Sequence, residues 1–316
     1  MEKVILGQTS IEVSKLCFGS LTMGPLQADK SPQEGGNLLL HGFERGINFL
    51  DTAELYETYP HIKNALKGWE REEIVIATKS YAYSQETAEN SLKKALKEMG
   101  TDYVDLFLLH EQESQHTLRG HAEALEYFIK MKEKGYIRAV GISTHTVAAV
   151  EASLKIKEIE ILHPIVNIAG LGIQDGTIEE MLKVLTEAYQ MGKGIYGMKP
   201  LGGGNLLKSF KECFDFVLGL DCLHAIAVGM QSKDEIDANI AIFQGKSIDK
   251  QLLEKIKGKK RKLKIDYWCE GCGKCTEICS HNALKIEADR LIVDHEKCVL
   301  CGYCSKSCPH FCIKVI

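Results

Sequence analysis

Short apolar runs alternate with longer amphipathic segments up to about residue 249. The runs have the length and composition of buried strands, and the longer segments place apolar residues three and four positions apart, as amphipathic helices do. The clearest helices are expected at 84–99 and 120–134. The expected strands lie at 15–19, 47–50, 73–78, 103–109, 139–142, 161–166, 194–198 and 225–229.

Eight strands, each followed by a helix, over roughly 250 residues indicate a closed (β/α)8 barrel, the TIM-barrel architecture. The sequence therefore predicts an α/β protein with a barrel at 1–262 and a small α+β domain at 263–316. A short hairpin around Gly7 is expected to plug the bottom of the barrel. The basic run 257–264 is expected to be a solvated linker rather than a nucleic-acid patch, with docking of an acidic electron carrier as the alternative.

Composition narrows the class of protein. Nearly half of the residues are apolar, which suffices for a large core, and the net charge of −4 gives no reason to expect nucleic acid as a partner. The first ten residues lack the apolar core of a signal peptide, and no apolar run approaches a membrane span. Nine of the twelve cysteines crowd into the last fifth of the chain, which indicates metal binding in a cytoplasmic protein rather than disulfides in a secreted one.

The crowded cysteines follow a regular spacing. Two runs of the form C-x2-C-x2-C-x3-C are separated by eighteen residues, and the second is followed by proline. Their members are Cys269, Cys272, Cys275 and Cys279, then Cys298, Cys301, Cys304 and Cys308. Three thiolates at this spacing can wrap around one iron–sulfur cube. A pair of structural zinc sites is the alternative, but zinc gains nothing from a third cysteine at regular spacing.

Residues 265–316 resemble the bacterial-type two-cluster 4Fe–4S ferredoxins. In those proteins the fourth cysteine of each run binds the cluster of the other run. The resemblance therefore implies one cluster held by Cys269, Cys272, Cys275 and Cys308, and another held by Cys298, Cys301, Cys304 and Cys279. Ser280 stands where the first run usually has proline, which removes no ligand. Cys312 belongs to neither run and is expected to be a small buried apolar residue.

Four polar residues converge on the expected mouth of the barrel, where barrel enzymes have their active sites. Asp51, Lys79 and His110 each follow an expected strand directly, and Tyr56 follows Asp51 by a short loop. A lysine ammonium near a tyrosine hydroxyl lowers the pKa of the phenol, and Asp51 would keep a buried Lys79 charged. We therefore expect Tyr56 to protonate a carbonyl oxygen as hydride reaches its carbon, with His110 orienting that oxygen.

Five motifs resemble the aldo-keto reductase family in their order and spacing, over residues 3 to about 239. They are GINFLDTAELY at 46–56, IATK at 76–79, LLH at 108–110, GISTH at 141–145 and KPLGGG at 199–204. The resemblance implies a catalytic tetrad of Asp51, Tyr56, Lys79 and His110 acting on a small carbonyl or alcohol. It also implies an extended NAD(P)(H) site. The expected contacts of that site are Ser143, Asn167, Lys199, Leu201, Gly203, Gly229, Ser232, Glu235 and Asn239.

Three positions depart from the pattern of that family. Met198 replaces the aromatic residue that stacks on the nicotinamide, and His163 replaces the glutamine that meets its carboxamide. Glu235 occupies the position of an arginine that binds the 2′-phosphate of NADP, so its carboxylate is expected to repel that phosphate and to favour the ribose hydroxyl of NAD. Lys233 is a nearby cation able to compensate. Nicotinamide binding is expected, its phosphate preference stays open, and no motif supports a flavin.

The two halves of the chain carry electrons in different numbers, because nicotinamide passes two as hydride and each cluster passes one. In one hypothesis the barrel reduces a carbonyl with electrons relayed by the clusters from a ferredoxin or other electron-transfer protein, through a flavin or a substrate radical. In a second, the barrel is an NAD(P)H-only reductase with structural or sensory clusters. In a third, the barrel is a silent scaffold and the chain is an electron carrier or docking module, which the complete tetrad disfavours.

Overall fold

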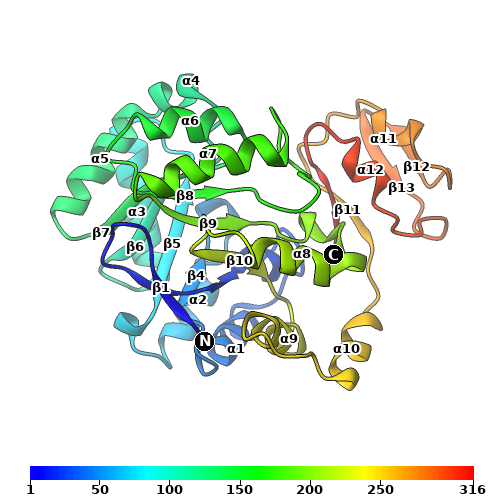
Figure 1. The fold of residues 1–316 in the computed structure, drawn as a ribbon, viewed down its shortest axis with the longest axis horizontal. Coiled ribbons are helices and arrows are strands. Elements are labelled where there is room, and N and C mark those ends of the chain that lie inside the picture. The colour runs from blue at the N-terminus through cyan, green and yellow to red at the C-terminus, as the bar shows by residue number, and fades with distance from the viewer.

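Eight strands of the computed structural model, which describes residues 1–316, close into a parallel barrel (Figure 1). The strand order is β10-β3-β4-β5-β6-β7-β8-β9, so the first and last barrel strands pair and no strand edge is left free. The predicted (β/α)8 barrel is therefore confirmed. The barrel strands are β3 (Leu16–Gly19), β4 (Phe49–Asp51), β5 (Val75–Ser80), β6 (Val104–Leu109), β7 (Ile137–Thr144), β8 (Ile161–Pro164), β9 (Gly194–Met198) and β10 (Ala225–Gly229).

Helices follow the barrel strands and cover the outside of the barrel (Figure 1). Helix α3 shows why the sequence forms them, since the Ser84 side chain caps its first turn through the Thr87 N–H and Gly100, with φ of 70°, ends it. The predicted helix at 120–134 begins at Ala122, because residue 120 ends the short α4. The helices are α1 (Pro32–Phe43), α2 (Tyr59–Leu66), α3 (Gln85–Met99), α4 (Gln115–Gly120), α5 (Ala122–Glu133), α6 (Val147–Leu154), α7 (Ile178–Gln190), α8 (Phe210–Leu218), α9 (Lys233–Phe243) and α10 (Lys250–Lys257). None of them is both long and apolar enough to cross a membrane.

Two buried clusters hold the barrel together. The larger contains 49 buried residues and joins the outer faces of the strands to the helices. The smaller fills the barrel interior, and it includes Leu6, Ile11 and Val13 from the N-terminal hairpin of β1 (Lys3–Ile5) and β2 (Glu12–Ser14). The structure therefore has the expected hairpin plug, and the open end is the one at which the strands finish.

The strands carry the predicted polar residues slightly differently from the expectation. Strand β4 ends on Asp51 itself, and β5 extends to Ser80, so that Lys79 lies inside the strand rather than after it. Every residue of both strands is buried. The two charged side chains are therefore positioned by regular β-structure, which fixes their separation across neighbouring strands.

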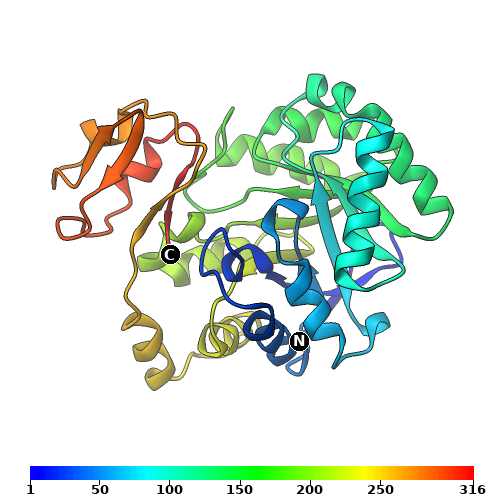
Figure 2. The same ribbon diagram turned by 180° about the vertical axis from the view of Figure 1, so that it is seen from behind.

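Residues 263–316 form a second unit at the barrel mouth, here called the C-terminal unit (Figure 2). Strand β11 (Leu263–Ile265) pairs with β14 (Ile313–Val315), and β12 (Leu284–Glu287) pairs with β13 (Arg290–Val293). Two one-turn helices, α11 (Lys274–Glu277) and α12 (Tyr303–Lys306), follow glycines with φ of about 80°. In both views the red final strand runs from this unit back to the barrel (Figures 1 and 2).

The basic run 257–264 is more structured than a solvated linker. Lys257 ends α10, and Lys264 lies in β11 opposite Lys314. Between them the side chains of Lys259 and Arg261 are only 35% and 20% exposed, because both turn towards the Glu235 carboxylate. The expectation of a fully solvated run was wrong for these residues, since a tertiary contact draws them onto the barrel.

Candidate active site and cluster sites

Lys79 and Asp51 form a fully buried ion pair at the barrel mouth. The Lys79 Nζ donates to Oδ1 and Oδ2 of Asp51 at 2.8 Å each and to the carbonyl oxygen of Thr52 at 2.7 Å. Burial alone would raise the pKa of Asp51, but the charges of Lys79 and His163 together with the hydrogen bonds from Lys79 and Tyr196 outweigh it, and the net pKa is lowered. Asp51 therefore stays ionised, and the buried Lys79 has the partner that a buried cation needs.

Tyr56 lies beside this pair on the short 3-10 helix η2 (Glu54–Tyr56). Its ring centroid is 4.9 Å from Lys79 Nζ, and its ring meets that of His110 edge-on, with centroids 5.7 Å apart. Burial, followed by the negative charge of Asp51, raises the pKa of Tyr56 well above its ordinary value. The expected lowering of this pKa was wrong for this arrangement, because Lys79 directs its hydrogen bonds to Asp51 and Thr52. Tyr56 is therefore held as a neutral phenol able to donate a proton.

His110 completes the group as a neutral imidazole. Its ring stacks on Tyr81, with centroids 4.5 Å apart, and its buried Nδ1 has no hydrogen-bond partner. Burial lowers the pKa of His110 to about 3. A neutral imidazole has one N–H donor and one acceptor nitrogen, so this ring can donate a hydrogen bond to an oxygen without carrying charge.

Two further residues reach the same carboxylate: Tyr196, which was missed in the sequence, and His163, which was noted there only as a departure from the family pattern. The Tyr196 hydroxyl donates to Asp51 Oδ1 at 2.9 Å, and His163 Nε2 lies 3.6 Å from the same oxygen. The His163 ring stacks on Tyr196 with centroids 3.9 Å apart, and its Nδ1 is 2.7 Å from the Tyr196 carbonyl oxygen. Tyr196 sits within an ordinary apolar strand, so no sequence signal distinguishes it from a core residue.

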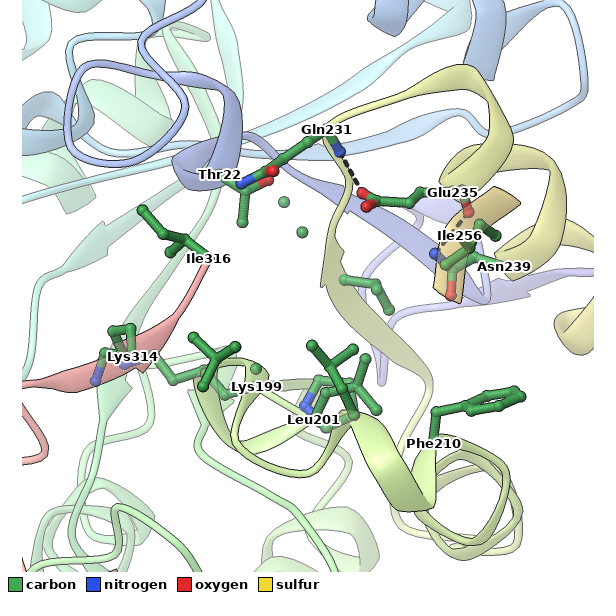
Figure 3. A pocket seen from close by; sticks show the side chains of 18 of the residues that line it. Thr22, Lys199, Leu201, Phe210, Gln231, Glu235, Asn239, Ile256, Lys314 and Ile316 are labelled. Carbon is green, nitrogen blue, oxygen red and sulfur yellow. Dashed lines mark hydrogen bonds between the residues drawn. The ribbon is translucent and has the colours of Figure 1, made fainter. Parts of the chain in front are cut away.

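A cavity of about 690 Å³ runs from this group to helix α9 (Figure 3). Asp51 and Tyr56 line this cavity, and so do Glu235 and Asn239 of α9. Six of the nine residues expected to contact a nucleotide line it. They are Lys199, Leu201, Gly203, Gly229, Glu235 and Asn239.

The other three expected contacts do not line the cavity and have other partners. The Ser143 hydroxyl accepts the backbone N–H of Glu111 at 2.8 Å. The Asn167 amide makes two hydrogen bonds of 2.9 Å with the backbone of Leu171. Ser232 caps α9. Their predicted contacts with a nucleotide stay predictions.

Glu235 is neutralised by the basic run, which the sequence did not place near it. Its Oε1 is 2.8 Å from Lys259 Nζ and 3.6 Å from an Arg261 nitrogen. Lys208 and Lys257 also line the cavity, whereas Lys233 does not. The lining of the cavity therefore carries a net positive charge, although α9 supplies a carboxylate.

The glycine loop after β9 contacts the C-terminal unit. A Cβ at Gly204 would lie 2.1 Å from the Val315 carbonyl oxygen, and one at Gly203 would lie 2.8 Å from Lys314 Cδ. Both glycines have positive φ. These glycines therefore permit close packing by β14, a role that the sequence pattern did not reveal.

The eight spaced cysteines surround two separate cavities in the C-terminal unit. One is lined by the first cluster site, Cys269, Cys272, Cys275 and Cys308. The other is lined by the second cluster site, Cys279, Cys298, Cys301 and Cys304. None of the cysteines is in a disulfide, and no three metal-binding side chains lie close enough to hold a single metal ion.

The donor set fits two iron–sulfur cubes. Each cavity is lined by the four thiols expected for one cluster, one of which comes from the other run, as interleaved ligation requires, and Cys312 also lines the first cavity. Cys312 is 2% exposed in the apolar core of the unit, as expected, and its sulfur lies 3.3 Å from that of Cys308.

These arrangements define an oxidoreductase-type barrel joined to an iron–sulfur domain, and comparison with known proteins narrows the class. The model of the aldo/keto reductase family matches residues 15–217, so the chain belongs to that family. The model of the 4Fe-4S dicluster domain matches residues 268–312 of the same chain. Both resemblances seen in the sequence are thereby confirmed.

Individual relatives agree with this assignment. The chain is 29% identical over 223 residues to "Probable aldo-keto reductase 1" of Glycine max, covering 65% of this chain and 60% of that protein. It is 29% identical over 192 residues to "Aldo-keto reductase" of Mycolicibacterium paratuberculosis, covering 57% and 62%. The chain thus spans about three-fifths of these relatives. The solved aldo-keto reductase from Bacillus halodurans in its holo form shares the fold, with a TM-score of 0.66, 24% identity, and coverage of 81% of this chain and 96% of that one.

Proposed function

We propose that the barrel interconverts a small carbonyl compound and its alcohol with NAD(P)(H), and that the C-terminal unit exchanges electrons with a ferredoxin-like protein. The observation that carries the first part is that Tyr56, with its charged neighbours Asp51 and Lys79, lines the same large cavity as Glu235 and Asn239 of α9. A proton donor at the end of a dinucleotide-sized cavity is what carbonyl reduction requires.

Each member of the tetrad has a distinct role in this proposal. Bound NAD(P)H supplies hydride to the carbonyl carbon. Tyr56 gives its proton to the carbonyl oxygen, and the neutral His110 donates a hydrogen bond that orients that oxygen. Asp51 fixes Lys79, whose ammonium beneath the Tyr56 ring stabilises the phenolate left after proton transfer.

The cations at the far end of the cavity support NADP(H) over NAD(H). Glu235 would repel a 2′-phosphate if it stood alone, but the positive charges of Lys259 and Arg261 compensate its negative charge. Lys257 and Lys208 contribute two further positive charges to the cavity lining. A relative from Saccharomyces cerevisiae, 32% identical over 121 residues, is named "NADPH-dependent alpha-keto amide reductase". A flavin in the same cavity stays an alternative without a supporting motif.

Replacing Lys259 and Arg261 with methionine tests the phosphate preference. We expect the double variant to bind NADP+ at least about tenfold more weakly, because charge-assisted contacts of this kind contribute about 1.5–3 kcal/mol each, while NAD+ binding changes little. Calorimetric titration with the two nucleotides measures both affinities. Lys250→Met on the exposed start of α10 is the matched control, and an equal loss for NAD+ would contradict the preference.

The clusters extend the proposal to a protein partner. A hydride carries two electrons, whereas each cluster carries one. The C-terminal unit would therefore accept electrons one at a time and deliver them to the two-electron chemistry of the barrel. This transfer needs a substrate or bound group that tolerates an odd electron. Apolar side chains around the second cluster site are exposed, namely Ile278 at 46%, Val299 at 50% and Tyr303 at 61%. We place the docking of the partner there. We also propose that residues 1–262 and 263–316 fold as separate domains and that the protein is cytoplasmic.

The test is oxidation of NADPH by a panel of aldehydes and ketones, with protein purified without air. We expect Tyr56→Phe to lower the rate about 10²–10⁴-fold, because general acid catalysis contributes about that much. Nucleotide affinity should be unchanged. Tyr83→Phe, an exposed tyrosine on the same face, is the control. Equal rates for Tyr56→Phe and the unaltered protein would refute the proton donor, and failure to bind nucleotide or turn over substrate would favour the electron-carrier alternative.

A further inference from the structure

The C-terminal unit is held rigidly against the barrel mouth. Strand β14 packs on the glycine loop so closely that a Cβ at Gly204 would clash with Val315. The Asn205 side chain donates to the carbonyl oxygen of Ile313 at 3.1 Å. Backbone contacts of this kind leave little freedom for one part to move against the other, so the distance from each cluster site to the cavity is fixed.

Phe311 lies between the first cluster site and the cavity wall. Its backbone N–H donates to the carbonyl oxygen of Cys308, a ligand of that site, at 3.2 Å. Its ring is 2% exposed and packs in one buried cluster with Ile165, Leu171 and Met198. Because Met198 lines the cavity, Phe311 connects Cys308, through its backbone hydrogen bond, with a residue of the cavity wall, through the packing of its ring.

The ring of Phe311 also lies close to two positively charged side chains at the barrel mouth. Lys314 Nζ is 3.3 Å from its centroid and Lys199 Nζ is 5.3 Å from it, both within cation–π range. The Lys199 ammonium is 2.8 Å from His145 Nε2, and the His145 ring meets Phe311 edge-on at 6.3 Å. Lys199 lines the cavity, so a ligand that displaces it changes the field at the ring.

Three of the nine non-glycine residues with positive φ belong to this region. Phe311 has φ of 47°, Lys199 has φ of 58° and Glu111 has φ of 47°, and none of them is glycine. Glu111 accepts a hydrogen bond from the Tyr81 hydroxyl, and Tyr81 stacks on His110. Left-handed conformations of non-glycine residues are costly and cluster at functional sites. The strained residues connect the domain interface to the catalytic group.

We infer that Phe311 couples the first cluster site to the catalytic end of the cavity, so that a ligand bound beside Met198 and Lys199 changes the electronic state of that cluster. The second site responds less, because it reaches the barrel through Leu300 and Gly302, which offer neither ring nor charge. The first cluster is then the internal end of the electron route and the second is the external end. This inference rests on the proposed nucleotide cavity and on both cluster sites.

Electron paramagnetic resonance of the reduced, anaerobic protein tests the coupling. The probe is the tetrahydro form of NADPH, which cannot transfer hydride, and calorimetry establishes that it binds. Cys301→Ser alters a ligand of the second site and so identifies the signal of the second cluster. We expect the probe to shift the g values of the first cluster in the unaltered protein and in Phe311→Tyr, and to leave them unshifted in Phe311→Leu.

A matched control comes from the opposite wall of the same site. Ile286 lines the first cluster cavity from β12, away from the barrel, so Ile286→Val should keep the full response to the probe. A bound probe that leaves the first cluster unchanged in the unaltered protein would overturn the coupling. An equal response in Phe311→Leu would also overturn it.

Redox titration without any nucleotide separates this inference from the proposed function. Removing a cation disfavours the reduced cluster, so Lys199→Met should lower the midpoint potential of the first cluster more than that of the second, and the effect should shrink when Phe311→Leu is also present. Lys93→Met, whose side chain is 70% exposed on α3, is the control. If the probe fails to bind, the proposed nucleotide cavity is refuted, but this double-mutant cycle still tests the coupling. Equal shifts of the midpoint potential by Lys199→Met with and without Phe311→Leu would refute the coupling.

Discussion

Lys79 determines the charge state of the barrel mouth, because every hydrogen bond that it makes goes to an oxygen of Asp51 or Thr52. An ammonium that is 0% exposed would ordinarily lose its proton or destabilise the fold. The carboxylate and the backbone carbonyl together replace the water that burial removes. Tyr56 lies beside this ammonium, and burial together with the charge of Asp51 keeps its phenol protonated.

The rate of carbonyl reduction should therefore be nearly independent of pH between about 5 and 9. His110 has its pKa lowered to about 3 by burial, so it is already neutral throughout that range. Tyr56 has its pKa raised above the ordinary value of about 10, so it remains protonated throughout. Steady-state rates of NADPH oxidation at saturating substrate measure this profile.

The reverse reaction supplies the control for that profile. Alcohol oxidation needs the tyrosine as a base, so its rate should rise with pH until above about 10, because the raised pKa makes the phenolate scarce at neutral pH. An inflection near pH 6.5 in the reductive direction would show that His110 titrates normally and would contradict the assigned state of the site.

At the scale of elements, the strands were readable because burial imposes a simple pattern on them. Strands at 194–198 and 225–229 were predicted with the bounds that they have, since each is a short apolar run. Lys79 was predicted just after β5 but lies inside it. The prediction was wrong because a charged residue usually indicates the end of a buried strand, and the sequence does not show that Lys79 has a partner on β4. The tetrad could be located from the ends of strands, whereas its charge state depended on contacts across strands.

The parts that could not be predicted depend on contacts between distant segments. A charge run such as 257–264 looks like a linker by composition, and only the fold shows that Lys259 reaches Glu235. The Gly203–Gly204 pair matched a nucleotide loop, but nothing in its sequence shows that β14 lies directly on it. Such contacts depend on the three-dimensional path of the chain, which brings segments distant in sequence next to each other.

Gly204→Ala should loosen the docking of the C-terminal unit. The new methyl group would lie 2.1 Å from the Val315 carbonyl oxygen, and φ of 86° is strained for alanine, so β14 must shift. We expect faster proteolysis of the 257–262 segment, measured by limited digestion of the cluster-loaded protein. Gly245→Ala is a stringent control, because Gly245 has φ of 67° but open space around it. Equal digestion of the two variants would mean that backbone strain, not β14 contact, is responsible.

The whole molecule combines a closed barrel with a unit whose two halves exchange ligands. Cys308 is the last cysteine of the second run but lines the first cluster cavity, and Cys279 is the last cysteine of the first run but lines the second cavity. The first cluster site therefore joins Cys308 to Cys275, 33 residues earlier in the chain, and the second joins Cys279 to Cys298, 19 residues later. In the proposed function the clusters would thus be cross-links of the C-terminal unit as well as electron carriers.

Cys308→Ala should therefore change the same cluster as Cys269→Ala, although the two residues lie in different runs. We expect iron to fall from about eight atoms towards about four, with loss of the first cluster signal by electron paramagnetic resonance. Cys279→Ala is the reciprocal variant and should affect the second signal. If Cys308→Ala instead matched Cys304→Ala, each run would bind its own cluster, and the interleaved assignment would be wrong.

The closeness of Cys312 to Cys308 has a consequence for repair after exposure to air. Their sulfurs are 3.3 Å apart and a disulfide needs about 2.0 Å, so once the cluster has been lost a small rotation lets the two thiols join, passing two electrons and two protons to dioxygen to form hydrogen peroxide. That bond would withhold Cys308 from incoming iron. The second cavity has no fifth cysteine in its lining. Rebuilding the damaged protein therefore calls for a thiol reductant at one cube and only iron and sulfide at the other.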